Sequence, residues 1–181
     1  MKIEVKKIKH ARSLSEETNA FTAQLYVDGE HIADCKNSGK GGMTDVYSKY
    51  SENKTKREYY RQMVQKTEAF CKTLPKYKGN LTMSLDFYID LEIEKDLNKK
   101  ETERILKSIN KKCLNSVVVI SKKKLEGFIA GIYSLQNKDV KMYSWKKPIA
   151  DIPDAIIKAQ LPAIKARLIG DEFIYNKNLP V

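Results

Sequence analysis

The sequence predicts an α+β protein: an N-terminal antiparallel β-hairpin sheet packed on an amphipathic helix, then a smaller C-terminal α/β unit of βαβ-like layout. Three patterns indicate this class. They are two alternating apolar runs joined by Asp28-Gly29, a helical apolar period over residues 55–74, and a β-branched run at residues 116–120. With 181 residues, 41% of them hydrophobic, the chain is long enough to bury a core. We expect two units, residues 1–80 and 81–181, or one continuous domain.

The N-terminal sheet is predicted from two strand patterns and a turn. Apolar residues on a charged background indicate an edge strand over residues 2–9, and a polar loop follows over residues 11–19. Residues 21–27 then alternate between apolar and polar side chains, and apolar residues return after Asp28-Gly29. This dipeptide is typical of two-residue hairpin turns. The return strand leads into the glycine cluster at residues 39–42.

Residues 55–74 give the clearest helical pattern, because apolar residues recur at three- and four-residue steps until Pro75 and Gly79 end the helix. Residues 81–93 are ambiguous. Their apolar residues alternate as in a strand, but they also form a helical stripe, and the acidic residues between them are poor strand formers. We expect a helix that continues through a turn into a second helix at residues 101–112, with a strand over 81–93 as the alternative.

The C-terminal unit is expected to contain a helix over residues 153–168, which Pro162 should kink or split. Its inward-facing residues would be Ile156, Ile157, Leu161, Ile164 and Leu168. The expected sheet elements are a buried strand at residues 116–120, further strands at 140–145 and 173–175, and a turn at 122–124.

The sequence disfavours membrane insertion, secretion and zinc binding. No apolar run approaches the roughly 18 residues that a membrane helix needs, and the first residues lack the apolar core of a signal peptide. The cysteines Cys35, Cys71 and Cys113 are widely spaced, and only His10 and His31 could join them as zinc ligands. We therefore expect a cytoplasmic protein with reduced, buried thiols, no bound metal and no cofactor.

The net charge of +11 arises from 34 basic and 23 acidic residues. Such a balance favours nucleic acid or another polyanion as the partner. Nearly all of the excess is lysine, whereas proteins that grip phosphates often use the bidentate fork of arginine. The alternative is therefore a genome rich in lysine codons, which would give a merely solvated basic surface.

The segment KNSGKGGMTD places three glycines around Lys40. A Walker phosphate loop needs a glycine five residues before its Gly-Lys pair, and a serine or threonine after the lysine. This chain has Asp34 and Gly41 at those positions, so nucleotide hydrolysis is not expected. The segment is either a flexible turn or an anion contact, in which glycine amides assist Lys36 and Lys40.

Three further patterns bear on function. Asp86, Asp90 and Glu94 would share one helical face and could hold a metal for nuclease chemistry, although a solvated face is the preferred interpretation. Residues 99–124 carry nine basic residues against two acidic ones. Aromatic residues are interleaved with lysines in residues 138–147, where Trp145 is expected in the core of a small sheet rather than free to stack on a base.

Several short motifs resemble a known group of proteins. They are Leu14-Ser-Glu-Glu-Thr, Phe21-Thr-Ala, Leu25-Tyr-Val-Asp-Gly29, Asn37-Ser-Gly-Lys-Gly-Gly42 and the tail Asn176-Lys-Asn-Leu-Pro180. Together they resemble small uncharacterised proteins of bacteriophages and mobile elements, which implies a phage-encoded protein acting in a bacterial cytoplasm. The order of hairpin and basic helix is also similar in layout to the double-stranded RNA-binding domain.

We expect a non-enzymatic phage or mobile-element accessory protein that binds an anionic partner, with nucleic acid as the leading candidate and no membrane partner. The alternatives are an anti-defence protein that inhibits a host bacterial protein or sequesters a nucleotide signal, and a metal-dependent nuclease. The predicted contacts are a basic loop and a basic helix face, formed by Lys36, Gly39, Lys40, Gly41, Gly42, Lys54, Lys56, Arg57 and Arg61.

Overall fold

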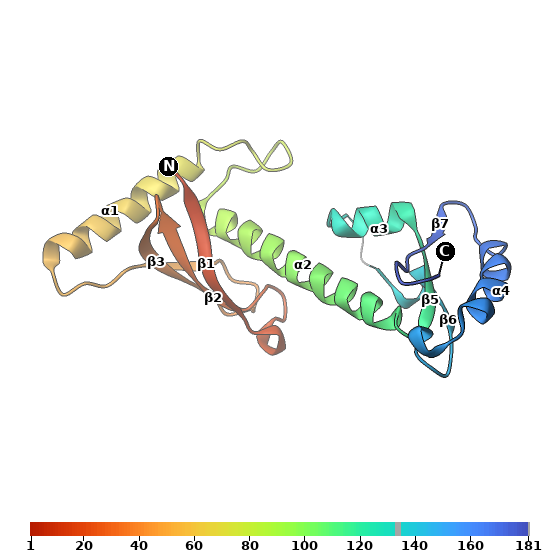
Figure 1. The fold of residues 1–181 in the computed structure, drawn as a ribbon. Coiled ribbons are helices and arrows are strands. Elements are labelled where there is room, and N and C mark those ends of the chain that lie inside the picture. Colours follow the sequence, from red (N-terminus) through yellow and green to blue (C-terminus); the bar gives the residue numbers. More distant parts are fainter. Residues whose placement is uncertain (133–134, 181) are drawn as a thin grey trace. The chain divides into compact units, whose positions relative to one another are not determined.

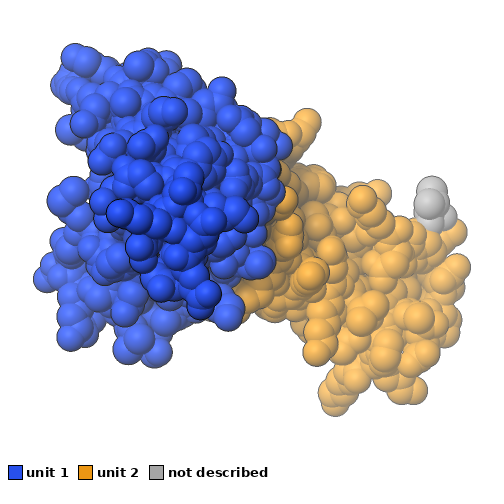
Figure 2. Space-filling model, turned by 90° about the vertical axis from the view of Figure 1, so that its left-hand side faces the viewer, with its two compact units in different colours: residues 1–96 blue, residues 97–181 orange. Residues whose placement is uncertain are grey.

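The computed structural model describes residues 1–132 and 135–180, and the α+β class is confirmed (Figure 1). The chain divides into two compact units, residues 1–96 and 97–181, coloured separately in Figure 2. The boundary falls inside a long helix, α2 (Leu85–Lys112). The sequence instead predicts a boundary between residues 80 and 81, before that helix, because Pro75 and Gly79 end the preceding helical pattern.

The N-terminal unit contains a four-stranded antiparallel sheet in the order β1-β2-β3-β4. Asp28 and Gly29 have φ angles of 47° and 87°, as the two central residues of a type I′ hairpin turn require. The predicted edge strand and hairpin are confirmed, whereas the last strand was not predicted. The strands are β1 (Ile3–His10), β2 (Phe21–Val27), β3 (Glu30–Asn37) and β4 (Asp45–Ser48), and a 3₁₀ helix, η1 (Arg12–Leu14), lies in the predicted polar loop.

Helix α1 (Lys54–Cys71) confirms the predicted amphipathic helix. Asn53 caps its N-terminus, because the Asn53 side chain accepts a hydrogen bond of 3.1 Å from the amide of Lys56. Tyr60, Thr67 and Cys71 form its buried side, and the helix packs against β3 and β4. The sheet is therefore covered on one face, as the sequence predicted.

Residues 85–112 form one uninterrupted helix. Ile89 and Ile93 are fully buried, whereas Leu81, which a strand would bury on the same face, is 57% exposed. The expectation of a helix is thus confirmed for residues 85–93, whereas residues 81–84 lie outside the helix. The expected turn before residue 101 is wrong, because no glycine or proline interrupts these residues and most of them are good helix formers.

The C-terminal unit contains a three-stranded sheet in the order β6-β5-β7, with both pairings antiparallel. The three predicted strands are confirmed, but the βαβ-like layout is wrong because the sheet has no parallel pair. The elements are β5 (Ser116–Ser121), α3 (Lys122–Ile129), η2 (Asn137–Asp139), β6 (Val140–Ser144), η3 (Ile149–Asp151), α4 (Asp154–Lys165) and β7 (Glu172–Ile174).

Two local predictions in this unit are wrong. Lys122–Lys124 form the first turn of α3 rather than a loop, because the Ser121 hydroxyl accepts the Lys124 amide and the Asp171 carboxylate accepts the Lys123 amide. Of the two outcomes expected at Pro162, a kink or a split, the split does not occur, because helix α4 continues to Lys165. Its Ile156, predicted to face inward, is 47% exposed.

The central strand β5 is buried on both faces, which explains its uninterrupted β-branched composition. On one face Val117 and Val119 pack with Ile164 of α4. Trp145, predicted to lie in the core, packs against this cluster but is only partly buried. On the other face Val118 packs with Ile109 and Cys113.

All three cysteines are free and buried, as predicted. Burial raises the pKa of the Cys35 thiol to about 12 and that of the Cys71 thiol to about 11, so neither forms a thiolate near neutral pH. Within residues 1–132 and 135–180, no helix is both long enough and apolar enough to cross a membrane.

Candidate functional site

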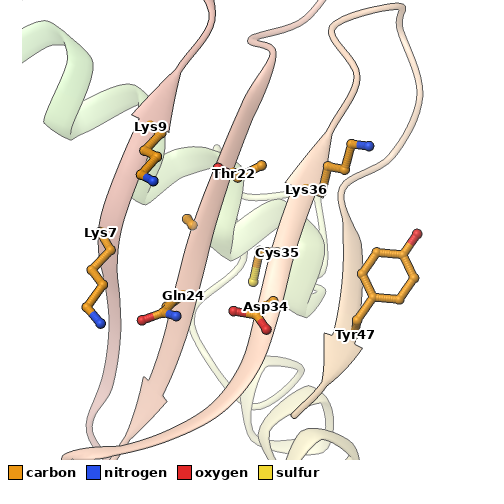
Figure 3. A pocket seen from close by; sticks show the side chains of 9 residues that line it. Lys7, Lys9, Thr22, Gln24, Asp34, Cys35, Lys36 and Tyr47 are labelled. Carbon is orange, nitrogen blue, oxygen red and sulfur yellow. The ribbon is translucent and has the colours of Figure 1, made fainter. Parts of the chain in front are cut away.

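The candidate site is the face of the N-terminal sheet that the helices leave uncovered. Along β2, Phe21, Ala23, Leu25 and Val27 are buried, while Thr22 is exposed and Gln24 and Tyr26 are partly exposed. Figure 3 shows this face, with helices passing behind the strands. The sheet is therefore apolar on one side and polar on the other, as its two-residue alternation requires.

A β-bulge in β1 changes which lysines reach this face. Lys6 pairs with Gln24 and Lys9 pairs with Thr22, so Lys7 and Ile8 together lie opposite Ala23. Without the extra residue, Lys6 and Lys9 would point to opposite faces, because they are an odd number of positions apart. Lys7 has a φ angle of 53°. This left-handed conformation costs a lysine roughly 1 kcal/mol or more.

All four strands contribute side chains to an open hollow on this face (Figure 3). Lys9 and Lys36 lie on either side of Thr22, and Tyr47 marks the outer edge on β4. The polar side chains that line the hollow are Lys7, Lys9, Thr22, Gln24, Asp34, Lys36 and Tyr47.

Aromatic rings lie on the same face. Tyr26 and His31 stack across β2 and β3, with their ring centroids 5.3 Å apart and an interplanar angle of 28°. The Lys6 ammonium lies 4.8 Å from the centre of the Tyr26 ring. Tyr47 is 58% exposed, and the pKa of its hydroxyl is raised by a hydrogen bond to the Asp45 carboxylate. Tyr47 is thus an exposed ring beside the lysines, whereas the partly buried Tyr26 ring is already in contact with His31 and Lys6.

The lysines of the hollow are electrostatically available. Lys7, Lys9 and Lys36 form no ion pair with any described residue. Nearby, Glu4 is paired with Lys2 and Lys6, at 3.1 and 3.2 Å, and Asp34 with His31 at 3.2 Å. The Glu4 charge is therefore balanced locally, whereas the Asp34 charge is balanced only when His31 is protonated.

The glycine loop is tied down rather than free. The Gly39 amide donates to the Asn37 side chain at 2.9 Å, and its carbonyl accepts the amides of residues 16–18 at 3.0 to 3.2 Å. Gly39 has a φ angle of 86°, and a Cβ atom there would lie 2.2 Å from the Leu14 carbonyl oxygen. The Gly41 amide donates to Thr18 at 3.4 Å. These two amides already have acceptors, while Lys40 and Gly42 remain exposed.

Asn37 connects this loop to the helical layer. Its buried side chain also accepts a hydrogen bond from Thr18 at 3.0 Å and donates to the Gly42 carbonyl at 3.0 Å and to Thr44 at 3.1 Å. Thr44 donates in turn to Asp90 of α2 at 2.5 Å. Burial raises the pKa of Asp90, and the charge of Asp86 raises it further, against the opposing effect of the Thr44 hydrogen bond.

Of the three carboxylates considered for metal binding, Asp90 therefore has a structural partner in Thr44. Nowhere in residues 1–132 and 135–180 do three or more histidine, cysteine, aspartate or glutamate side chains gather as a metal site would require.

Outside the glycine loop, the sequence-predicted contact residues form two groups. The first is Lys36 alone, and the second is the set of basic residues on α1. Lys36 lies in the hollow, near the C-terminal end of β3. The basic residues of α1 are all exposed, with Arg57 above the Tyr50 ring at 5.9 Å. The Tyr59 hydroxyl of α1 donates to Glu30 at 3.0 Å, which places this half of the helix beside the first residue of β3. Glu30 and Lys36 are separated along the strand by about 20 Å. The second group consists of Lys54, Lys56, Arg57 and Arg61.

Sequence reasoning missed Lys7, Lys9, Tyr26 and Tyr47 as candidate site residues. The polar half of the β2 alternation was a usable signal, because it indicates that one face of the sheet is solvated. The bulge leaves no comparable signal in the sequence, because an extra residue in one strand is recognised only from its pairing with the neighbouring strand.

Comparison of the chain with protein-family models, with curated proteins and with solved structures found no match.

Gly39→Ala should destabilise the protein by about 2 kcal/mol or more, because the added Cβ would meet backbone atoms at a left-handed φ. Gly42→Ala is the matched control, since a Cβ there meets no atom within 4 Å. Urea unfolding monitored by circular dichroism measures both. Equal stabilities for the two variants would contradict the contacts described for Gly39.

Asp90→Asn should raise the free energy of unfolding at neutral pH, because the amide still accepts the Thr44 hydrogen bond without burying a charge. A raised pKa means that the Asp90 contribution is fully present below the pKa of unfolded aspartate and is lost as the pH rises through the folded value. Between these two pKa values, the Asp90→Asn variant should therefore lose less stability with rising pH than the parent protein. Urea titrations at a series of pH values test this, and parallel curves for the two proteins would contradict it.

Proposed function

We propose that this protein binds single-stranded nucleic acid on the open face of its N-terminal sheet. The observation that supports this most directly is the β1 bulge, which places Lys6, Lys7 and Lys9 on the same face as Lys36 and the exposed Tyr47 ring. The bulge also retains a lysine in a left-handed conformation. Such strain concentrates at functional positions.

Lysine ammonium groups on this face would neutralise backbone phosphates and release their counterions, which supplies sequence-independent affinity. Lys7, Lys9 and Lys36 suit this role because they have no ion-pair partner among the described residues. Thr22 and Gln24, between them on β2, offer hydrogen-bonding groups to bases or sugars.

The aromatic side chains favour a single strand over a duplex. Bases stack on exposed rings only when they are not already stacked inside a double helix. Tyr47, which is 58% exposed at the edge of the lysine hollow, provides such a surface. Nothing in this arrangement requires catalysis. The protein would act as a binding accessory factor of a phage or mobile element in a bacterial cytoplasm, as its sequence resemblance implies.

The sheet face and the α1 face can be separated with two charge-matched variants. One carries Lys7→Gln, Lys9→Gln and Lys36→Gln, and the other carries Lys54→Gln, Lys56→Gln and Arg57→Gln. Binding of a labelled oligothymidylate is followed by fluorescence anisotropy over a salt series. The sheet variant should lose roughly ten-fold in affinity and lower the salt slope by about 2, while the helix variant binds normally.

The reverse pattern would assign binding to α1, one of the two contacts predicted from the sequence, and would overturn the sheet proposal. An affinity that does not respond to salt, in the unmodified protein, would also overturn it. Thermal unfolding of both variants confirms that the folded state persists.

Stacking gives a second test within the same site. Tyr47→Ala should weaken binding of the single strand by roughly 1 to 3 kcal/mol, as loss of one base–aromatic contact does. Tyr50→Ala is the control, because Tyr50 is 72% exposed but lies outside the hollow, beside Arg57. Equal losses for the two variants would contradict a stacking role for Tyr47.

A further inference from the structure

The positive charge of the chain is concentrated in the C-terminal unit. Residues 97–181 contain 17 of the 34 basic residues but only 8 of the 23 acidic ones, a formal charge of +9 out of +11. Residues 1–96 contain the other 17 basic residues with 15 acidic ones, a formal charge of +2. The two units therefore differ in their acidic residues and not in their basic ones.

This difference bears on the origin of the excess charge. A genome rich in lysine codons would raise the lysine content of both units, and it would not remove carboxylates from one of them. The C-terminal unit has about half as many acidic residues as the N-terminal unit, with a similar length. Its charge thus points to an anionic partner.

Part of this charge forms a stripe on α2. Four basic residues recur at steps of four, three and four residues, so they share one side of the helix, and all of them are exposed. On the other side, Ile105, Ile109 and Cys113 pack against the β5 residue Val118. The packing of the unit therefore fixes which side faces solvent. We call Lys100, Arg104, Lys107 and Lys111 the basic stripe.

The stripe extends over about 16 Å of helix and presents its charges roughly one helical turn apart. Arg104 is partly neutralised, since it donates to Glu101 at 2.6 and 2.8 Å. Lys107 and Lys111 form no ion pair with any described residue. The stripe contains no aromatic side chain, in contrast to the open face of the N-terminal sheet.

We infer that the basic stripe of α2 contacts the sugar-phosphate backbone of double-stranded nucleic acid. A straight row of cations on a rigid helix complements the regular phosphate row of a duplex, whose strands carry one charge per about 1.7 Å of axis. Arg104, the one arginine of the row, is already held by Glu101, so we assign the contact to phosphates and not to base edges. This site has different residues and a different strand state from the sheet face, and it does not depend on that proposal.

The test uses the full chain and two variants that each remove two lysines from the C-terminal unit. Lys107→Gln with Lys111→Gln removes the free part of the stripe. Lys158→Gln with Lys165→Gln is the charge-matched control, because both lysines are exposed on α4. The probes are labelled 20-base-pair duplexes of DNA and of RNA with arbitrary sequence, and a single-stranded oligothymidylate, each titrated over a salt series.

The stripe variant should lose roughly five- to ten-fold in duplex affinity and lower the salt slope by about 2, while single-strand binding is retained. The control should bind the duplex normally. Equal losses for both variants would show diffuse attraction and overturn the stripe, as would failure of the unmodified protein to bind either duplex. Normal duplex binding by the sheet variant Lys7→Gln, Lys9→Gln, Lys36→Gln would confirm that the two sites are independent. Loss of duplex affinity in that variant alone would place the duplex on the sheet face and overturn the proposal.

Discussion

The arrangement of the N-terminal unit depends on one buried amide, the side chain of Asn37. Its oxygen accepts hydrogen bonds from Gly39 and Thr18, and its nitrogen donates to Gly42 and Thr44. A neutral amide has two donors and two acceptor lone pairs, so this side chain is fully satisfied although only 4% exposed. By holding both ends of the glycine loop, Asn37 directs the chain back along β3. There Lys36 pairs with Asp45, and Tyr47 becomes the outer border of the lysine hollow.

The two units achieve their electrostatic character by different means. In the N-terminal unit acidic and basic residues nearly balance, and strand geometry, particularly the bulge at Lys7, determines which lysines share a face. In the C-terminal unit few carboxylates oppose the basic residues, so the surface is positive without any special backbone feature. The first arrangement suits a shaped site with aromatic contacts, and the second suits attraction to a regular phosphate backbone.

The sequence predicted elements that depend on local signals. Asp28-Gly29 specifies its hairpin through backbone conformation, and the period of residues 55–74 specifies α1 through burial of one side. Elements that depend on distant partners were missed. Strand β4 has only four residues and is defined by pairing with β3. The start of α3 requires Asp171, which is remote in sequence but accepts the Lys123 amide.

The same limit explains what was and was not predicted of the candidate site. Lys36 was identified because it is basic and adjoins an unusual loop, and it does lie in the hollow. The amides of Gly39 and Gly41 looked free for an anion in the sequence. Their acceptors are Asn37 and Thr18, however, and no local sequence pattern predicts these contacts. The bulge in β1 was not predicted for a related reason, because the register of a strand is defined only by its pairing with another strand.

The connectivity of the two sheets has a consequence for the order in which the chain folds. In the N-terminal sheet every strand pairs with its neighbour in sequence, so its contacts are short in range and require little loop closure. This sheet can form while later residues are still being synthesised. In the C-terminal sheet Val119 of β5 pairs with Ile174 of β7. The second edge of the buried central strand β5 is therefore paired only after β7, close to the end of the sequence, has been synthesised. Until then an apolar edge stays open, and this interval is when the chain is most prone to aggregation.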